Sequence, residues 1–125
     1  MPSDFPGPIT AITLFTEDLP ATKAFYEQVF RLPVHYEDPD SCVFIFGGTM
    51  INLLKIEEAV DLIAPANPST PSGFQFTLDV DDVDAMVAEL KERGVELLNG
   101  PIDRPWGIRT ASFKDPAGNI WEIAK

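Results

Sequence analysis

Apolar and polar residues alternate along residues 9–18, which predicts a β-strand with one apolar face. That face carries Ile12 and Leu14. Asp18 follows the strand and is placed to cap a helix that runs to Val29. The beginning of the chain therefore predicts a strand that leads directly into a helix.

The same pattern recurs, in the same phase, at residues 73–82. Asp82 is the matching helix cap, and Gly94 lies where a left-handed helix end is expected. Between them, apolar residues follow the spacing of a helix that buries one face: Val83, Met86, Val87 and Leu90. The chain thus contains an internal repeat.

Three short strands are expected after each helix, because turn residues divide the sequence there. The strands are expected near residues 34–37, 42–46, 50–56, 95–98, 108–114 and 119–124. The turn signals are Asp38-Pro39-Asp40, Gly47-Gly48, Asn99-Gly100-Pro101 and Asp115-Pro116-Ala117-Gly118-Asn119. Residues 57–72 hold three prolines, which indicates a linker with one helical turn at its start.

The predicted architecture is an α+β fold in which a βαβββ module occurs twice. We expect a single domain over residues 1–125, with module one at 9–56 and module two at 73–124. The modules form a cupped mixed sheet with the helices on its outer face. The large apolar strand residues should pack on the helices: Ile12, Leu14, Phe74, Phe76 and Leu78. The concave side should carry Ala11, Thr13, Phe15, Gln75, Thr77, Asp79 and Glu122.

Composition narrows the range of partners. The chain has 20 acidic and 9 basic residues, a formal net charge of -11, and it is 45% hydrophobic. This composition is typical of a folded domain, and the acidity disfavours nucleic acid and anionic membranes while it favours cationic ligands. The single cysteine, Cys42, and a start, Met1-Pro2-Ser3-Asp4, without a basic or long apolar run predict a cytoplasmic protein.

Two motifs in register with the repeat support a family assignment. Glu17-Asp18-Leu19 followed by Phe25-Tyr26, its partner Val80-Asp81-Asp82-Val83-Asp84, and the closing stretch from Phe113 to Glu122 resemble the vicinal oxygen chelate superfamily. That superfamily includes glyoxalase I, extradiol dioxygenases and the metal-free bleomycin-resistance proteins, and the chain is most similar to the metal-free members. The resemblance implies the paired-module fold and a homodimer.

The resemblance also implies four positions for metal ligands, one on the first and one on the last strand of each module. In this chain they are Ala11, Asn52, Gln75 and Glu122. Ala11 has no donor atom, and two amides with one carboxylate are a poor cage for a transition metal. The only histidine, His35, lies away from these positions. We therefore expect no metal cofactor; if a divalent metal ion binds, its ligands are Asn52, Gln75 and Glu122.

Further residues are expected around a pocket on the concave side. Trp106 and Phe15 could sandwich a flat ligand, Arg109 could pair with a buried Glu122, and Asp79 would make the pocket negative. The predicted pocket residues are Thr13, Phe15, Asn52, Gln75, Thr77, Asp79, Trp106, Arg109 and Glu122.

Two function classes follow, and the sequence does not decide whether the protein is an enzyme. The favoured one is a metal-free protein that binds a small cationic or aromatic compound, as antibiotic-sequestering proteins do. The alternative is a divalent-metal-dependent lyase, isomerase or dioxygenase of the glyoxalase type, supported by Gln75 and Glu122. A third class is acid–base chemistry without metal, with Glu122 or Asp79 as the catalytic base.

Overall fold

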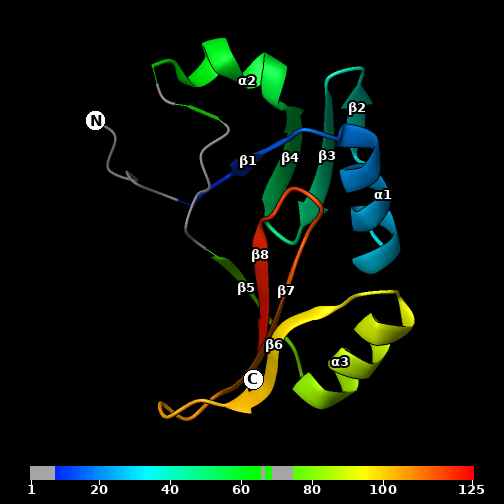
Figure 1. The fold of residues 1–125 in the computed structure, drawn as a ribbon, viewed down its shortest axis with the longest axis vertical. Helices are drawn as coiled ribbons and strands as arrows, with labels where there is room; N and C mark the ends of the chain where they lie inside the picture. Colours follow the sequence, from blue (N-terminus) through cyan, green and yellow to red (C-terminus); the bar gives the residue numbers. More distant parts are fainter. Residues whose placement is uncertain (1–7, 66, 69–74) are drawn as a thin grey trace.

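The fold is known from a computed structural model, which describes residues 8–65, 67–68 and 75–125. In each module a strand, a helix and three further strands follow one another as the repeat predicts, and α2 lies between the two modules (Figure 1). In order they are β1 (Ala11–Thr16), α1 (Leu19–Val29), β2 (Tyr36–Asp38), β3 (Ser41–Phe46), β4 (Thr49–Lys55), α2 (Ile56–Ile63), β5 (Gln75–Asp79), α3 (Val83–Glu92), β6 (Leu97–Asp103), β7 (Arg109–Lys114) and β8 (Ile120–Ala124).

The strands form two four-stranded sheets with the same topology. The first sheet has the order β1-β4-β3-β2 and the second β5-β8-β7-β6. In each sheet the first strand runs parallel to the last strand of its module, and the remaining pairs are antiparallel. This is the predicted α+β architecture of two tandem βαβββ modules.

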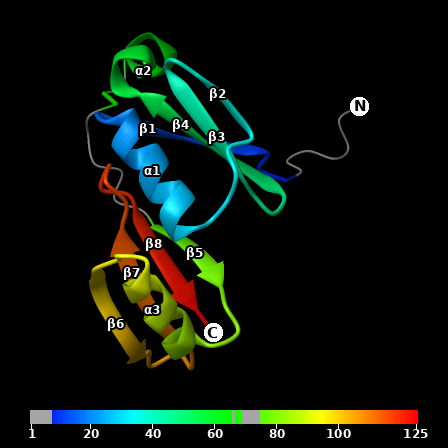
Figure 2. The same ribbon diagram turned by 90° about the vertical axis from the view of Figure 1, so that its right-hand side faces the viewer.

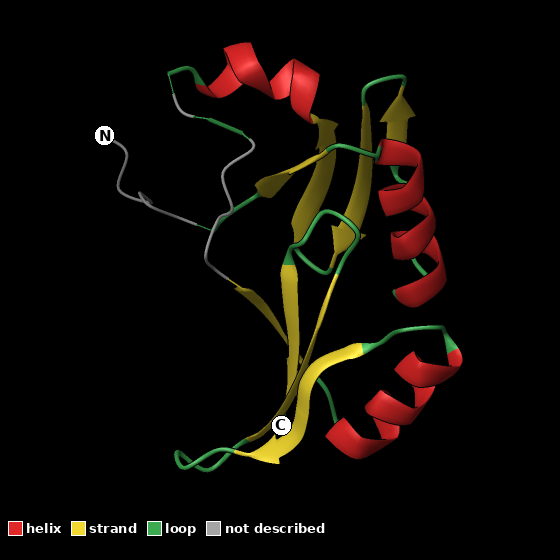
Figure 3. Ribbon diagram, in the orientation of Figure 1, coloured by secondary structure: helices red, strands yellow, loops and turns green. Residues whose placement is uncertain are grey.

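Helices α1 and α3 cover the same side of the two sheets, so the opposite side stays open (Figures 2 and 3). Both helices begin at the predicted caps. The Asp18 carboxylate accepts a hydrogen bond from the Ala21 N–H at 3.0 Å, and the Asp82 carboxylate accepts one from the Ala85 N–H at 3.1 Å. Each cap satisfies one of the N–H groups that a helix start leaves without a partner.

The core lies between the sheets and these two helices. Leu14 is 4% exposed, and Ile12, Phe76 and Leu78 pack against the buried cluster, so the predicted faces are confirmed for these residues. Phe74 lies outside the described residues. In each strand, every second side chain therefore faces the helices and the side chains between them face the open side, as the alternation predicted.

An aromatic cluster joins the two modules. The ring of Trp121 in β8 lies 4.9 Å from that of Phe30 and 5.1 Å from that of Phe46, both in module one, and 4.9 Å from that of Phe76 in its own sheet. Trp121 is 2% exposed. Aromatic pairs of this kind contribute to stability beyond the area they bury. Because the cluster contains rings from both modules, the two modules share one core.

A buried hydrogen bond accompanies this cluster. The Tyr26 hydroxyl in α1 donates to Asp115 Oδ2 in the β7–β8 turn at 2.8 Å, and Tyr26 and Asp115 are 0% and 4% exposed. Burial, followed by the Asp115 charge, raises the pKa of Tyr26 far above its ordinary value, so the hydroxyl keeps its proton. The same carboxylate accepts hydrogen bonds from the Ala117 and Asn119 N–H groups, which closes the turn.

Two segments differ from the sequence predictions. The linker begins with the eight-residue helix α2 rather than a single turn, and its residues 66 and 69–72 lie outside the described residues. Strand β6 continues through the predicted turn Asn99-Gly100-Pro101 as an irregular strand with register shifts. Gly100 has φ +86°, and a Cβ there would lie 2.5 Å from the Thr110 carbonyl oxygen. Only glycine allows this close approach of β6 to β7.

The face assignment predicts unequal effects for two adjacent substitutions. Phe76→Ala should lower the free energy of unfolding by about 3 kcal/mol, because it removes a ring packed on Trp121. Gln75→Ala, on the exposed face, should change it by less than about 0.5 kcal/mol. Urea denaturation of both variants measures the difference, and equal losses would show that the faces are reversed.

The two tyrosines provide a second matched pair. Tyr26→Phe should lower the free energy of unfolding by about 1–3 kcal/mol, because it removes a buried hydrogen bond to the Asp115 carboxylate. Tyr36→Phe removes a hydroxyl that donates to Asp38 at 3.1 Å on an exposed strand, and it should be close to neutral. Thermal and urea unfolding test both; a neutral Tyr26→Phe would mean that this bond does not stabilise the contact between the modules.

Candidate functional site

The open side of the second sheet carries a row of four polar side chains at one level. Strand register places Thr77, Glu122, Ser112 and Asn99 next to one another across β5, β8, β7 and β6. The Thr77 hydroxyl donates to Glu122 Oε1 at 3.0 Å. Glu122 is half-buried, and within the described parts of the chain it forms no ion pair with a lysine or arginine. Gln75 and Asp79 flank Thr77 on β5, and both are exposed.

The first sheet has an equivalent row with different chemistry. It consists of Thr13, Asn52, Val43 and Tyr36, across β1, β4, β3 and β2. Asn52 thus takes the place that Glu122 has in the second sheet, and its buried Oδ1 has no hydrogen-bond partner within the described ranges. Around this row lie apolar side chains, including Phe15, Ile45 and Met50. This face can contact the apolar or aromatic part of a ligand.

Arg109 does not pair with Glu122, so that prediction was wrong. Its Nε and Nη2 donate to the two oxygens of Asp84 in α3, each at 3.0 Å, and its Nη1 donates to Asp103 at 3.0 Å. Arg109 shares the parity of Ala111 and Phe113, which face the helix, whereas Glu122 lies on the opposite side of the sheet. The guanidinium therefore supports the contact between α3 and the β6–β7 hairpin.

Trp106 and Phe15 are also not brought together in this chain. Trp106 is 68% exposed at the turn between β6 and β7, and the Arg104 guanidinium lies 6.0 Å from its ring centroid. Phe15 is half-buried in β1. The β6–β7 turn and β1 lie at opposite ends of the molecule in both views (Figures 1 and 2). Within one chain they cannot sandwich a ligand.

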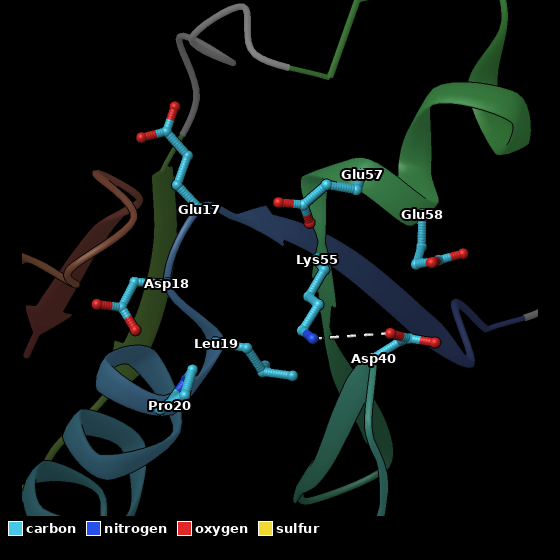
Figure 4. Close-up of a pocket in the computed structure, with 8 residues that line it drawn as sticks. All are labelled: Glu17, Asp18, Leu19, Pro20, Asp40, Lys55, Glu57 and Glu58. Carbon is cyan, nitrogen blue, oxygen red and sulfur yellow. Dashed lines mark ion pairs between the residues drawn. The ribbon is translucent and has the colours of Figure 1, made fainter.

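A cavity of about 300 Å³ lies elsewhere, where β1 passes into α1 and β4 into α2. Its lining is mostly acidic: Glu17, Asp18, Leu19, Pro20, Asp40, Lys55, Glu57 and Glu58 (Figure 4). Lys55 Nζ lies 3.7 Å from Asp40 Oδ1, and the other carboxylates are exposed. Sequence reasoning did not find this cavity, because its residues come from three segments that only the fold brings together.

The paired modules and the open face can be compared with known proteins. The model of the glyoxalase/bleomycin resistance protein/dioxygenase superfamily matches residues 9–123. The chain belongs to this superfamily. A curated relative, the uncharacterized protein YraH of Bacillus subtilis, is 32% identical over 121 residues, which cover 91% of this chain and 94% of the relative.

Solved structures of this superfamily share the fold. A glyoxalase-related enzyme from Fulvimarina pelagi superposes with a TM-score of 0.83 at 25% identity, covering 94% of this chain and 87% of that one. A lactoylglutathione lyase from Agrobacterium tumefaciens gives 0.74 at 26% identity, covering 95% and 93%. The fold and the superfamily are therefore shown, whereas activity depends on the residues at the site.

The four positions at which superfamily enzymes bind a metal do not form a suitable donor set here. The methyl group of Ala11 supplies no ligand atom, and Asn52 and Gln75 supply only neutral amide oxygens. Glu122, the one carboxylate, is already bonded to Thr77. Within the described segments no three histidine, cysteine, aspartate or glutamate side chains lie close enough to hold a metal ion. The residues present do not fit a transition-metal centre.

In the part of the chain that the structure describes, no helix has both the length and the apolar character needed to cross a bilayer.

Proposed function

We propose that this protein binds a small cationic, aromatic compound on its open face without a metal ion, as a drug- or antibiotic-sequestering protein does. The observation that carries the proposal is Glu122. A half-buried carboxylate is costly unless it is paired, and among the described residues no basic side chain pairs with it. A ligand cation can supply the missing charge.

The first sheet supports the aromatic part of the proposal. Tyr36, Ile45 and Met50 are 55%, 38% and 38% exposed on its open face. An aromatic and apolar surface together with a carboxylate binds planar organic cations, and the two sheets supply one part each. The net charge of -11 attracts such ligands over longer distances.

We also propose that two copies of the chain form a dimer and that the protein works in the cytoplasm. Val60 and Leu62 on α2 are 50% and 64% exposed, and these apolar side chains support a self-association surface. The buried, free Cys42 thiol is compatible with a reducing compartment.

Proflavine, a planar aromatic cation, tests the binding proposal. Chelator-treated protein should bind it, as measured by fluorescence titration, and Glu122→Gln should weaken binding about tenfold or more, because a charge-assisted contact is lost. Glu57→Gln makes the same charge change at an exposed site on α2 and serves as the control. The proposal fails if Glu122→Gln has no effect, and a loss confined to Glu57→Gln would place the ligand in the acidic cavity.

One observation favours a second function. A lactoylglutathione lyase shares the fold, and Gln75 and Glu122 are residue types that can bind metal. Calorimetric titration of chelator-stripped protein with nickel, zinc, manganese and anaerobic ferrous iron decides between the two. We expect no tight binding; tight binding that Glu122→Ala abolishes would replace the proposal with a divalent-metal lyase, isomerase or dioxygenase.

The dimer has its own test. Light scattering at micromolar concentration should give twice the chain mass of 13.8 kDa. Leu62→Lys, at an exposed position on α2, should shift the mass toward that of one chain, because a buried unpaired charge opposes association. A monomeric mass for the unaltered protein would contradict the dimer.

A further inference from the structure

The polar row of the second sheet distinguishes between classes of cation. Its central residue, Glu122, has a hydroxyl neighbour on each side: Thr77 on β5 and Ser112 on β7. Thr77 bonds to Oε1 at 3.0 Å, which orients the carboxylate, and no hydrogen bond or ion pair from the described residues reaches Oε2. A carboxylate held in this way can accept hydrogen bonds from a ligand at a defined position.

The two basic side chains of β7 are either paired with other residues or displaced along the strand from Glu122. Arg109 bonds to Asp84 and Asp103 on the other side of the sheet. Lys114 lies on the open side but pairs in register with Ile120, one step away from Glu122, and it is exposed. The position facing Glu122 is therefore available to a ligand cation.

Ser112 provides an independent observation. Its side chain is 3% exposed, and its Oγ has no hydrogen-bond partner within the described residues. A buried hydroxyl without a partner is unfavourable, and a ligand group that reaches it gains the missing hydrogen bond. Asn99 is the exposed neighbour of Ser112 in the row.

We infer that this row selects a hydroxylated amine, such as an amino sugar or an amino alcohol, within the binding function proposed above. The ligand ammonium donates to Glu122 Oε2, and a ligand hydroxyl bonds to Ser112 Oγ. Adjacent strands are about 4.8 Å apart, a separation that two substituents in 1,3 positions of a six-membered ring can span. Thr77 acts as a positioning residue, because it orients Glu122 rather than the ligand.

Three small probes separate the two contacts. D-Glucosamine has both groups, D-glucose has only hydroxyls, and cyclohexylamine has only the ammonium. In titrations followed by two-dimensional amide NMR at neutral pH, glucosamine should bind about tenfold more tightly than either control, as expected when one charge-assisted contact and one neutral contact combine. The largest shifts should fall on β7 and β8.

Variants then assign each contact. Ser112→Ala should reduce glucosamine binding to the cyclohexylamine level. Thr77→Val, which keeps the side-chain shape, should weaken both amines, and Thr77→Ser should restore them. A purely structural role for Thr77 would not produce this rescue by serine. The amide spectra also show whether each variant remains folded.

The outcomes distinguish this inference from the proposed function. If proflavine binds in a Glu122-dependent way but glucosamine shows no preference over the two controls, or Ser112→Ala has no effect, the inference is overturned and the proposed function stands. If neither proflavine nor glucosamine binds, both are overturned. Shifts that map to α2 and the acidic cavity instead of β7 and β8 also overturn the inference.

Discussion

The packing of Trp121 between the two modules is the contact on which the rest of the structure depends. Its indole touches rings from module one and from its own sheet, so neither module has a complete core alone. The Tyr26–Asp115 hydrogen bond adds direction to this apolar contact, because it fixes α1 against one particular turn. Since both interactions lie on the helix side, they do not involve the opposite side of either sheet.

The open side shows how a repeated fold can support one asymmetric site. Equivalent strand positions hold Asn52 and Glu122 in the central strands, and Val43 and Ser112 beside them. The backbone therefore supplies two matching rows, and the side chains make one row apolar with an amide and the other acidic with hydroxyls. The two rows therefore differ in these few side chains and not in the backbone frame.

Much of this arrangement could be predicted from the sequence. The alternation at Leu14 and Phe76 and the caps at Asp18 and Asp82 are local signals, and local signals identify strands, helix starts and faces. The same alternation places Arg109 with Ala111 and Phe113 on the helix side. The sequence pattern therefore argues against a pairing of Arg109 with Glu122, which lies on the other side of the sheet. Helix α2 was underestimated because the following prolines outweighed the spacing of Ile56, Ala59 and Ile63.

Other features depend on tertiary contacts that no local pattern encodes. The acidic cavity combines three separate segments, and the buried Ser112 hydroxyl is notable only because of what surrounds it. Whether Trp106 reaches a ligand depends on the direction of the whole β6–β7 hairpin, which a turn signal does not specify.

The close approach at Gly100 divides this hairpin into a part that is constrained by sterics and a tip that is not. At its base any side chain larger than hydrogen would meet the backbone of Thr110 and Ala111, so substitutions there are opposed by sterics. At its tip Trp106 is surrounded by solvent and can change without disturbing the core. The tip can thus accept other residues while the base keeps the hairpin in register, which separates changes in surface chemistry from foldability along a single pair of strands.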